Sequence, residues 1–246
     1  MATIFNEILY RPFLNALILF YDYVPLHDFG IAVILLTILI RLILFPLFYK
    51  GARDQAIIQR LAPRVKEIQG IHKNDKQEQA RALMELYREH RVNPLSGFLL
   101  LFIQLPVLIA LYGVFLRGFS SDYLGALYGF VPHPTTLNHF FLGFVDLTQR
   151  NILIVLLAAM AQYFQGKLSL PPDTGGKKEL SGAEAIGRQM VYMGPVLTVV
   201  FLYFLNLPSA VGLYWLTTSA FSVVQQVAIN KRIAKYFEND KSSRVK

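Results

Sequence analysis

Long apolar segments constrain this 246-residue chain more than any other feature. Five segments reach, or come close to, the roughly 20 apolar residues that a helix needs to cross a bilayer. They cover residues 29–48, 95–116, 151–168, 189–207 and 209–229. Charged residues make up only 16% of the chain, against roughly 25% in an ordinary soluble domain. The sequence therefore predicts an all-α integral membrane protein with five transmembrane helices.

The distribution of lysine and arginine predicts how these helices are oriented. Twenty of these residues lie in or beside the segments 49–94, 169–188 and 230–246, and only three lie in the N-terminus and the segment 117–150. Short loops rich in lysine and arginine stay in the cytoplasm. We therefore expect a multi-pass protein with its N-terminus outside and its C-terminus in the cytoplasm. Because the net charge of +8 gathers on that side, specific nucleic-acid binding is not expected.

The two extracytoplasmic parts are predicted to lie at the membrane surface. Residues 1–28 include an apolar run that is interrupted by Glu7, Arg11 and Pro12 and is too short for a span. We interpret it as an interfacial amphipathic helix; a cleaved signal or a sixth span is the alternative. The segment 117–150 is an extracytoplasmic loop whose aromatic residues suit the membrane interface.

The cytoplasmic parts differ in pattern. Apolar residues recur at helical spacing on both sides of a turn at Asn74-Asp75, which predicts a helical hairpin over residues 49–94. It is either a docking arm for a partner or anionic lipid headgroups, or a solvated surface. Residues 169–188 are rich in proline and glycine and are predicted to form a flexible loop, while residues 230–246 form a basic tail.

Apart from Lys167 at the end of the third span, Arg41 is the only charged residue inside the predicted spans. It lies nine residues before Lys50, which places it roughly 13 Å inside the helix end. Either its side chain reaches the cytoplasmic headgroups, or it lines a water-filled cavity and attracts an acidic group of a ligand. Neutral polar residues on the spans favour the cavity, namely Thr37, Gln104, Gln162, Gln165, Asn206, Thr217, Thr218, Ser219 and Ser222.

Catalysis is not expected from this chain. There is no cysteine, and the predicted spans contain no aspartate, glutamate or histidine, so they can form neither an acid pair nor a metal site. The five histidines lie in loops without ligand spacing, and the Gly175–Lys178 stretch lacks the spacing of a phosphate-binding loop. We predict no catalytic residue, no metal and no cofactor.

Several ordered motifs resemble one family of membrane proteins. The stretch GIAVILLTILIRLILFPLFYK (30–50) is similar to the first core helix of the YidC/Oxa1/Alb3 membrane insertases, bacterial YidC branch, with the arginine in place. LMELYREHRVNPLSG (83–97), IQLPVLIALY (103–112) and LPSAVGLYW (207–215) resemble the hairpin, the second core helix and the last hairpin of spans. Only 28 residues precede the first span, so we expect a version without the large periplasmic domain of many relatives.

The resemblance implies a fold, a site and partners. The fold would be five core helices around a hydrophilic groove that is open to the cytoplasm. Carried over by motif, Arg41, Gln104 and Trp215 would line the client-binding groove, together with Thr37, Gln165 and Ser219; Ser219 stands where the family commonly has asparagine. The partners would be nascent membrane-protein clients, the ribosome, a Sec translocon, signal-recognition machinery and anionic lipids, in the bacterial inner membrane.

The resemblance implies a membrane protein insertase and chaperone. It would move short hydrophilic client segments across the membrane through the groove and release their hydrophobic helices laterally into lipid. A small transporter or channel is an alternative, but the chain has no convincing internal repeat. A folding chaperone without insertase activity is the other alternative.

Overall fold

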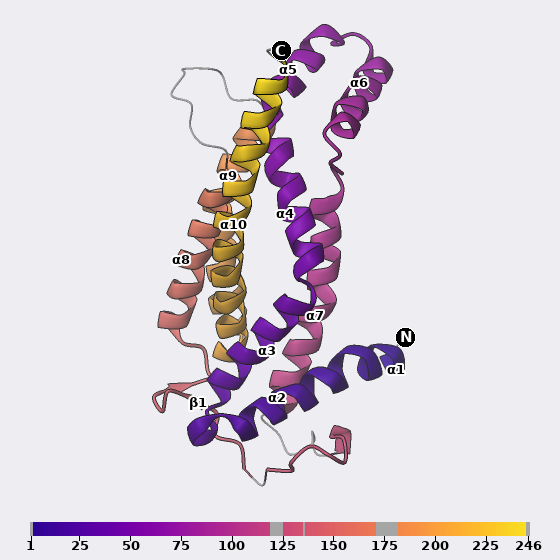
Figure 1. Cartoon of the computed structure of the whole chain (residues 1–246). Helices are drawn as coiled ribbons and strands as arrows, with labels where there is room; N and C mark the ends of the chain where they lie inside the picture. Colours follow the sequence, from indigo (N-terminus) through magenta and orange to yellow (C-terminus); the bar gives the residue numbers. More distant parts are fainter. Residues whose placement is uncertain (1, 119–124, 135, 171–181, 245–246) are drawn as a thin grey trace.

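The computed structural model describes residues 2–118, 125–134, 136–170 and 182–244. Figure 1 shows an elongated bundle of long helices, with a helical hairpin at one end and the N-terminal helix lying across the other. The elements are α1 (Ala2–Phe5), a π-helical turn (Asn6–Tyr10), α2 (Arg11–Tyr23), a 3-10 turn (Pro25–His27), α3 (Phe29–Ile43), α4 (Phe45–Arg60), α5 (Ala62–Ile71), α6 (Lys76–Glu89), α7 (Ser96–Gly118), β1 (Phe140–Phe141), β2 (Val145–Asp146), α8 (Ile152–Ser169), α9 (Gly182–Val199), a second π-helical turn (Val200–Phe204) and α10 (Ser209–Arg244).

The first predicted span, residues 29–48, is not one straight helix. It is divided between α3 and α4, which meet at Leu44 at an angle of 69°. Pro46 explains the bend, because a proline cannot donate the helical hydrogen bond and its ring collides with the carbonyl four residues earlier. α4 then continues to Arg60 and supplies the first part of the predicted hairpin.

The hairpin itself contains α5 and α6. α5 begins after a break at Leu61, next to Pro63, and the turn that follows ends at Asp75. The Asp75 carboxylate caps α6 by accepting hydrogen bonds of 3.0 Å from the backbone of Gln77 and of Glu78. A small apolar cluster joins the hairpin region to α10; its buried members are Ala56, Ile57, Leu61, Val65, Leu86, Val92, Ile229 and Ile233.

Two boundaries in the second half differ from the prediction. The segment 169–188 was expected to be a flexible loop, yet α9 already begins at Gly182; residues 171–181 lie outside the described part of the chain. The expected span 209–229 and basic tail 230–246 form one helix, α10, through Arg244. No proline or glycine follows Gly212 in α10, so the sequence contains no residue that would stop the helix.

The main core lies at the end of the bundle opposite the α5–α6 hairpin, where α2 and α3 meet α7, α8 and α10 (Figure 1). Leu14, Leu17 and Ile18 of α2 are fully buried in it. The N-terminal segment therefore packs on the bundle with its apolar side, and its predicted place at the membrane surface stays a prediction.

The segment 117–150 contains a short antiparallel β-hairpin, β1–β2, which no sequence pattern predicted. The buried carboxylate of Asp28 ties this hairpin to α3. One of its oxygens caps α3 by accepting from Ile31 N at 2.9 Å, and the other accepts from Leu142 N at 2.6 Å. The loop between the second and third predicted spans is thus fixed to the start of the first.

Gly30 allows the β-hairpin to contact α3 closely. A Cβ atom on this glycine would lie 2.6 Å from Phe141 Cβ, too close for either backbone to keep its position. We expect Gly30→Ala to lower the free energy of unfolding by about 1–3 kcal/mol, as overpacking does in other cores. Thermal unfolding in detergent measures the change. Gly70→Ala is the control. A Cβ atom on Gly70 would have no atom within 4 Å apart from its chain neighbours and its own helix backbone, and alanine favours a helix. A Gly30→Ala protein as stable as wild type would contradict the close packing.

The apolar helices are compatible with a membrane environment. By length and apolarity, one described helix is able to span a bilayer, α8, or two if the bent pair α3–α4 counts as one span. α7 and α9 contribute shorter apolar stretches, Phe102–Leu116 and Val191–Phe204. Only 22% of the α8 window is buried, so its apolar surface faces outward, where contact with lipid is more favourable than contact with water.

Candidate functional site: a polar cavity among apolar helices

A cavity of about 370 Å³ lies between the helices. We call it the polar cavity and define it by its lining residues: Arg41, Phe48, Ala52, Gln55, Leu100, Gln104, Leu108, Gln162, Gln165, Ser169, Tyr214, Trp215, Thr218, Ser219, Ser222, Gln225 and Gln226. α3, α4, α7, α8 and α10 all contribute. Most of the polar groups are uncharged, and none of the lining residues is acidic.

Arg41 is the one charged residue in this lining. Its side chain is only 7% exposed, and its guanidinium carbon lies 4.4 Å from the centre of the Phe48 ring. Within the described part of the chain the guanidinium makes no hydrogen bond or ion pair, so the aromatic ring is its main favourable contact. Because no acidic side chain lines the cavity, an arginine in this position could pair with an anionic group of a ligand.

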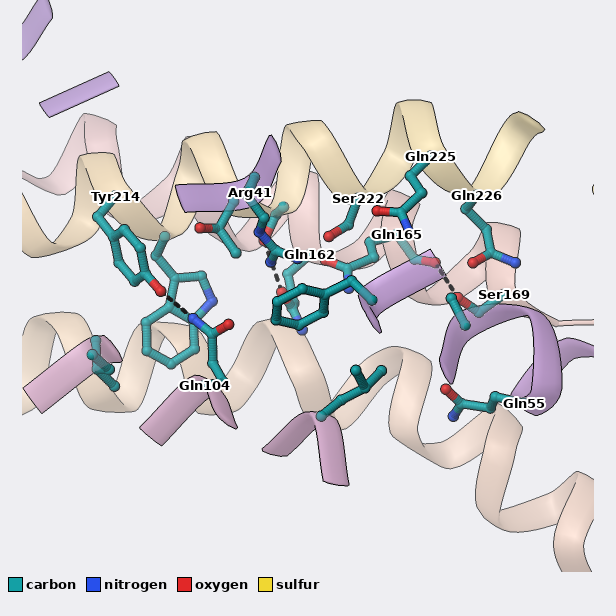
Figure 2. Close-up of a pocket in the computed structure, with 17 residues that line it drawn as sticks. Arg41, Gln55, Gln104, Gln162, Gln165, Ser169, Tyr214, Ser222, Gln225 and Gln226 are labelled. Atoms are coloured by element: carbon teal, nitrogen blue, oxygen red, sulfur yellow. Dashed lines mark hydrogen bonds between the residues drawn. The ribbon is translucent and has the colours of Figure 1, made fainter. Parts of the chain in front are cut away.

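A tyrosine and an amide lie on one side of Arg41. Gln104 Nε2 donates a hydrogen bond to the Tyr214 hydroxyl, which joins α7 to α10 across the cavity (Figure 2). Trp215 follows on α10, and its indole ring stacks on Phe201 with the ring centres 6.5 Å apart. Gln104 and Trp215, both expected in the site, therefore lie in the lining with Arg41.

The other three expected site residues differ in their positions. Ser219 donates a hydrogen bond of 3.0 Å to Gln162 Oε1, which joins α10 to α8, and Gln165 lies one turn further along α8. Both Ser219 and Gln165 line the polar cavity. Thr37 does not belong to the lining. It is buried, and its hydroxyl donates to the Val33 carbonyl at 2.7 Å, so its contribution to client binding stays a prediction.

Sequence reasoning missed several lining residues. Tyr214 belongs to a quoted motif but was not chosen, and Gln55 lies beyond the end of the predicted first span. Gln225 and Gln226 were not chosen either. A usable signal existed, since Tyr214, Thr218, Ser222 and Gln225 recur on α10 every three or four residues and so share one side of the helix.

The polar cavity and nearly all the helices fall within one region of similarity to known proteins. Residues 19–236 match the family described as 60Kd inner membrane protein. A protein of Fusobacterium nucleatum subsp. nucleatum named "Membrane protein insertase YidC" is 35% identical over 205 residues, which cover 83% of this chain and 87% of that protein. The chain belongs to the YidC family of membrane protein insertases.

Other YidC proteins match over a smaller share of their own length. The "Membrane protein insertase YidC" of Geobacter metallireducens is 32% identical over 228 residues, or 91% of this chain and 37% of that protein. The protein of the same name from Francisella philomiragia is 34% identical over 206 residues, 83% of this chain and 33% of its own. The chain thus spans about a third of the length of these YidC relatives.

The polar cavity of this YidC-family chain offers hydrogen-bonding groups and one cation. In the described ranges, no group of three or more histidine, aspartate or glutamate side chains could hold a metal ion. The lining can donate and accept hydrogen bonds and attract an anion. These groups are therefore suited to binding a polar segment.

Proposed function

We propose that this chain is an insertase that moves short hydrophilic segments of client proteins across the membrane through the polar cavity. The observation that supports this most is the buried guanidinium of Arg41, which faces a cavity without an acidic lining residue. A structural arginine at such a position would normally be paired. An unpaired one is suited to a client that supplies the negative group itself.

The polar cavity would act by shortening the apolar path. A hydrophilic client tail loses its hydration when it enters hydrocarbon, and each unpaired polar group then costs several kcal/mol. Lining amides and hydroxyls replace part of that hydration, and Arg41 attracts acidic residues of the tail for a short time. The membrane potential, positive outside, draws each negative charge outward with about 2.3 kcal/mol per 100 mV.

Lateral release would supply the driving force. Large apolar side chains of α7 and α9 are exposed, among them Phe102, Ile109 and Val196. A client helix could leave along these surfaces into lipid, gaining about 25 cal/mol for each Å² of apolar surface removed from water. No nucleotide or cofactor is required for such a step.

The proposal includes a topology. The five predicted spans would form the hydrophilic groove, with the N-terminus outside and the C-terminus in the cytoplasm of a bacterial inner membrane. The hairpin of α5 and α6 would then project into the cytoplasm, where it would receive clients from the ribosome, a Sec translocon or signal-recognition machinery. Its position against α10 is supported by Ile229 and Ile233, which belong to one apolar cluster with Val65 of α5 and Leu86 of α6. Next to this cluster, Arg232 donates a hydrogen bond of 3.1 Å to the Tyr49 hydroxyl and so joins α10 to α4.

Reconstitution tests this function. Purified protein in liposomes is mixed with ribosome-bound single-span clients that carry a short acidic or neutral tail, and protection of the tail from added protease is measured. We expect protection that depends on the protein, because empty liposomes offer no polar path. Protection no greater than in empty liposomes would refute the insertase and leave a chaperone or a transporter.

A further inference from the structure

Glutamine is the dominant polar residue of the polar cavity. Six of the seventeen lining residues are glutamines: Gln55, Gln104, Gln162, Gln165, Gln225 and Gln226. They come from α4, α7, α8 and α10, so they reach the cavity from several sides. Figure 2 shows Gln165, Gln225 and Gln226 near one another on one side of Arg41, with Gln104 on the other.

Half of these glutamines have partners within the protein. Gln104 binds Tyr214, Gln162 accepts from Ser219, and Gln226 Nε2 donates to Asn230 at 3.1 Å. The first two bonds join α7 and α8 to α10, and the third lies within α10. The amide groups of these three glutamines are therefore at least partly committed to the fold.

The side-chain amides of Gln55, Gln165 and Gln225 are not committed in this way. None of the three makes a side-chain hydrogen bond with any residue of the described segments. Gln225 is the clearest case, because it is 7% exposed and its Nε2 is buried without a partner. A buried amide that faces a cavity without a partner is ready to bond a polar group brought into that cavity.

The chemistry of the amide identifies that group. A glutamine side chain carries the same donor and acceptor as a peptide unit, so it can pair with a main-chain N–H and C=O at once. It carries no charge and does not distinguish one client side chain from another. Arg41, in contrast, binds acidic side chains strongly and interacts only weakly with an uncharged tail.

We propose that Gln165 and Gln225, with Gln55, bind the main chain of an extended client segment in the polar cavity, whatever its side chains are. This inference rests on the proposed insertase function. It divides recognition between two sets of groups: Arg41 discriminates by charge, and the amides replace the hydration of the client backbone. An extended backbone needs such partners because its peptide groups are not bonded to one another as they are in a helix.

Two synthetic clients test the proposal. Each has one apolar helix and a short uncharged tail, made of glycine in one client and of glycolic acid, the ester analogue of glycine, in the other. The ester tail has no main-chain N–H, and its carbonyls are much weaker hydrogen-bond acceptors than those of a peptide. Insertion into liposomes containing the full chain is followed by protease protection, for wild type and for the double variant Gln165→Met, Gln225→Met. Methionine keeps roughly the length of glutamine but removes the amide.

The two tails should respond differently. The double variant should insert the glycine tail about tenfold more slowly, which corresponds to the loss of one or two amide bonds to a desolvated backbone. Insertion of the ester tail should change less than about twofold, since it has no N–H to donate and its ester carbonyls accept only weakly from the glutamine amides. Gln77→Met serves as the matched control, because Gln77 is exposed on α6, away from the polar cavity.

Two results would overturn the inference alone. An equal loss for both tails would assign the glutamines to the shape of the cavity, and no loss for either would show that their amides bind nothing. Failure of the wild-type protein to insert the glycine tail above empty liposomes would instead overturn the proposed function, and this inference with it.

Discussion

Replacing Arg41 with alanine should lower insertion of a client with an acidic tail by about 10- to 100-fold. A hydrogen bond between charged groups contributes about 1.5–3 kcal/mol, and the buried Arg41 guanidinium has no hydrogen-bonding partner among the described residues that would compete with the client. A neutral tail should insert within about twofold of the wild-type rate. Arg41→Lys should give an intermediate rate for the acidic client, because it keeps the charge but loses the planar group. Protease protection in liposomes measures all three.

Stability separates this effect from misfolding. Arg41 makes no ion pair or hydrogen bond with the described residues, so its removal relieves an uncompensated buried charge and should not lower the unfolding temperature. Arg150→Ala is the matched control. Arg150 also lies over an aromatic ring, at 4.6 Å from the centre of Tyr203, but it is exposed and outside the polar cavity. Equal losses for acidic and neutral tails in Arg41→Ala would refute the attraction of acidic groups.

The largest loss of stability is expected for Asp28→Ala. This change removes the cap of α3 and also the acceptor of the partly buried hydrogen bond from Leu142 N. A cap contributes about 1 kcal/mol and a hydrogen-bonding group left without its partner costs about 1–3 kcal/mol, so the free energy of unfolding should fall by roughly 3 kcal/mol. Thermal and denaturant unfolding in detergent measure it.

Two further variants distinguish the two roles of Asp28. Asp28→Ser keeps a capping oxygen but is too short to reach Leu142 as well, so about half of the loss should return. Asp75→Ala removes a comparable cap from the exposed α6 and should cost only about 1 kcal/mol. If Asp28→Ala lost no more than Asp75→Ala, the bond to the β-hairpin would contribute nothing.

Local sequence patterns predicted where the helices lie, but not where one bends or how far another continues. Apolar periodicity located all the long helices, since each needs one apolar side whatever its neighbours are. The bend at Leu44 also had a visible cause in Pro46, although a proline in an apolar segment does not fix an angle. The run of α10 beyond residue 229 was missed because the charged tail looked like a separate segment. In the structure it is helical, with Ile229 and Ile233 packed against the hairpin region.

The site was predictable where the signal was chemical. A lone arginine in an apolar helix is costly, and that cost alone drew attention to Arg41. The family resemblance placed Gln104 and Trp215 near it, and the polar residues of the spans added Gln165 and Ser219. The structure brings all four into the same cavity lining. Gln55 was missed because it lies on α4 beyond the bend, and only tertiary structure returns it to the cavity. The β-hairpin bound to Asp28 was missed because strands of two residues have no recognisable pattern.

The continuity of α10 has a mechanical consequence. A helix of 36 residues is about 54 Å long and resists bending over most of that length. Its first residue, Ser209, donates a hydrogen bond from its hydroxyl to the Gln149 carbonyl at 2.6 Å. Further along the helix, Ile229 and Ile233 pack against the hairpin region. α10 therefore connects the hairpin region to the polar cavity without a break. Tyr214 and Gln225 of the cavity lining lie on the same continuous helix as these two isoleucines.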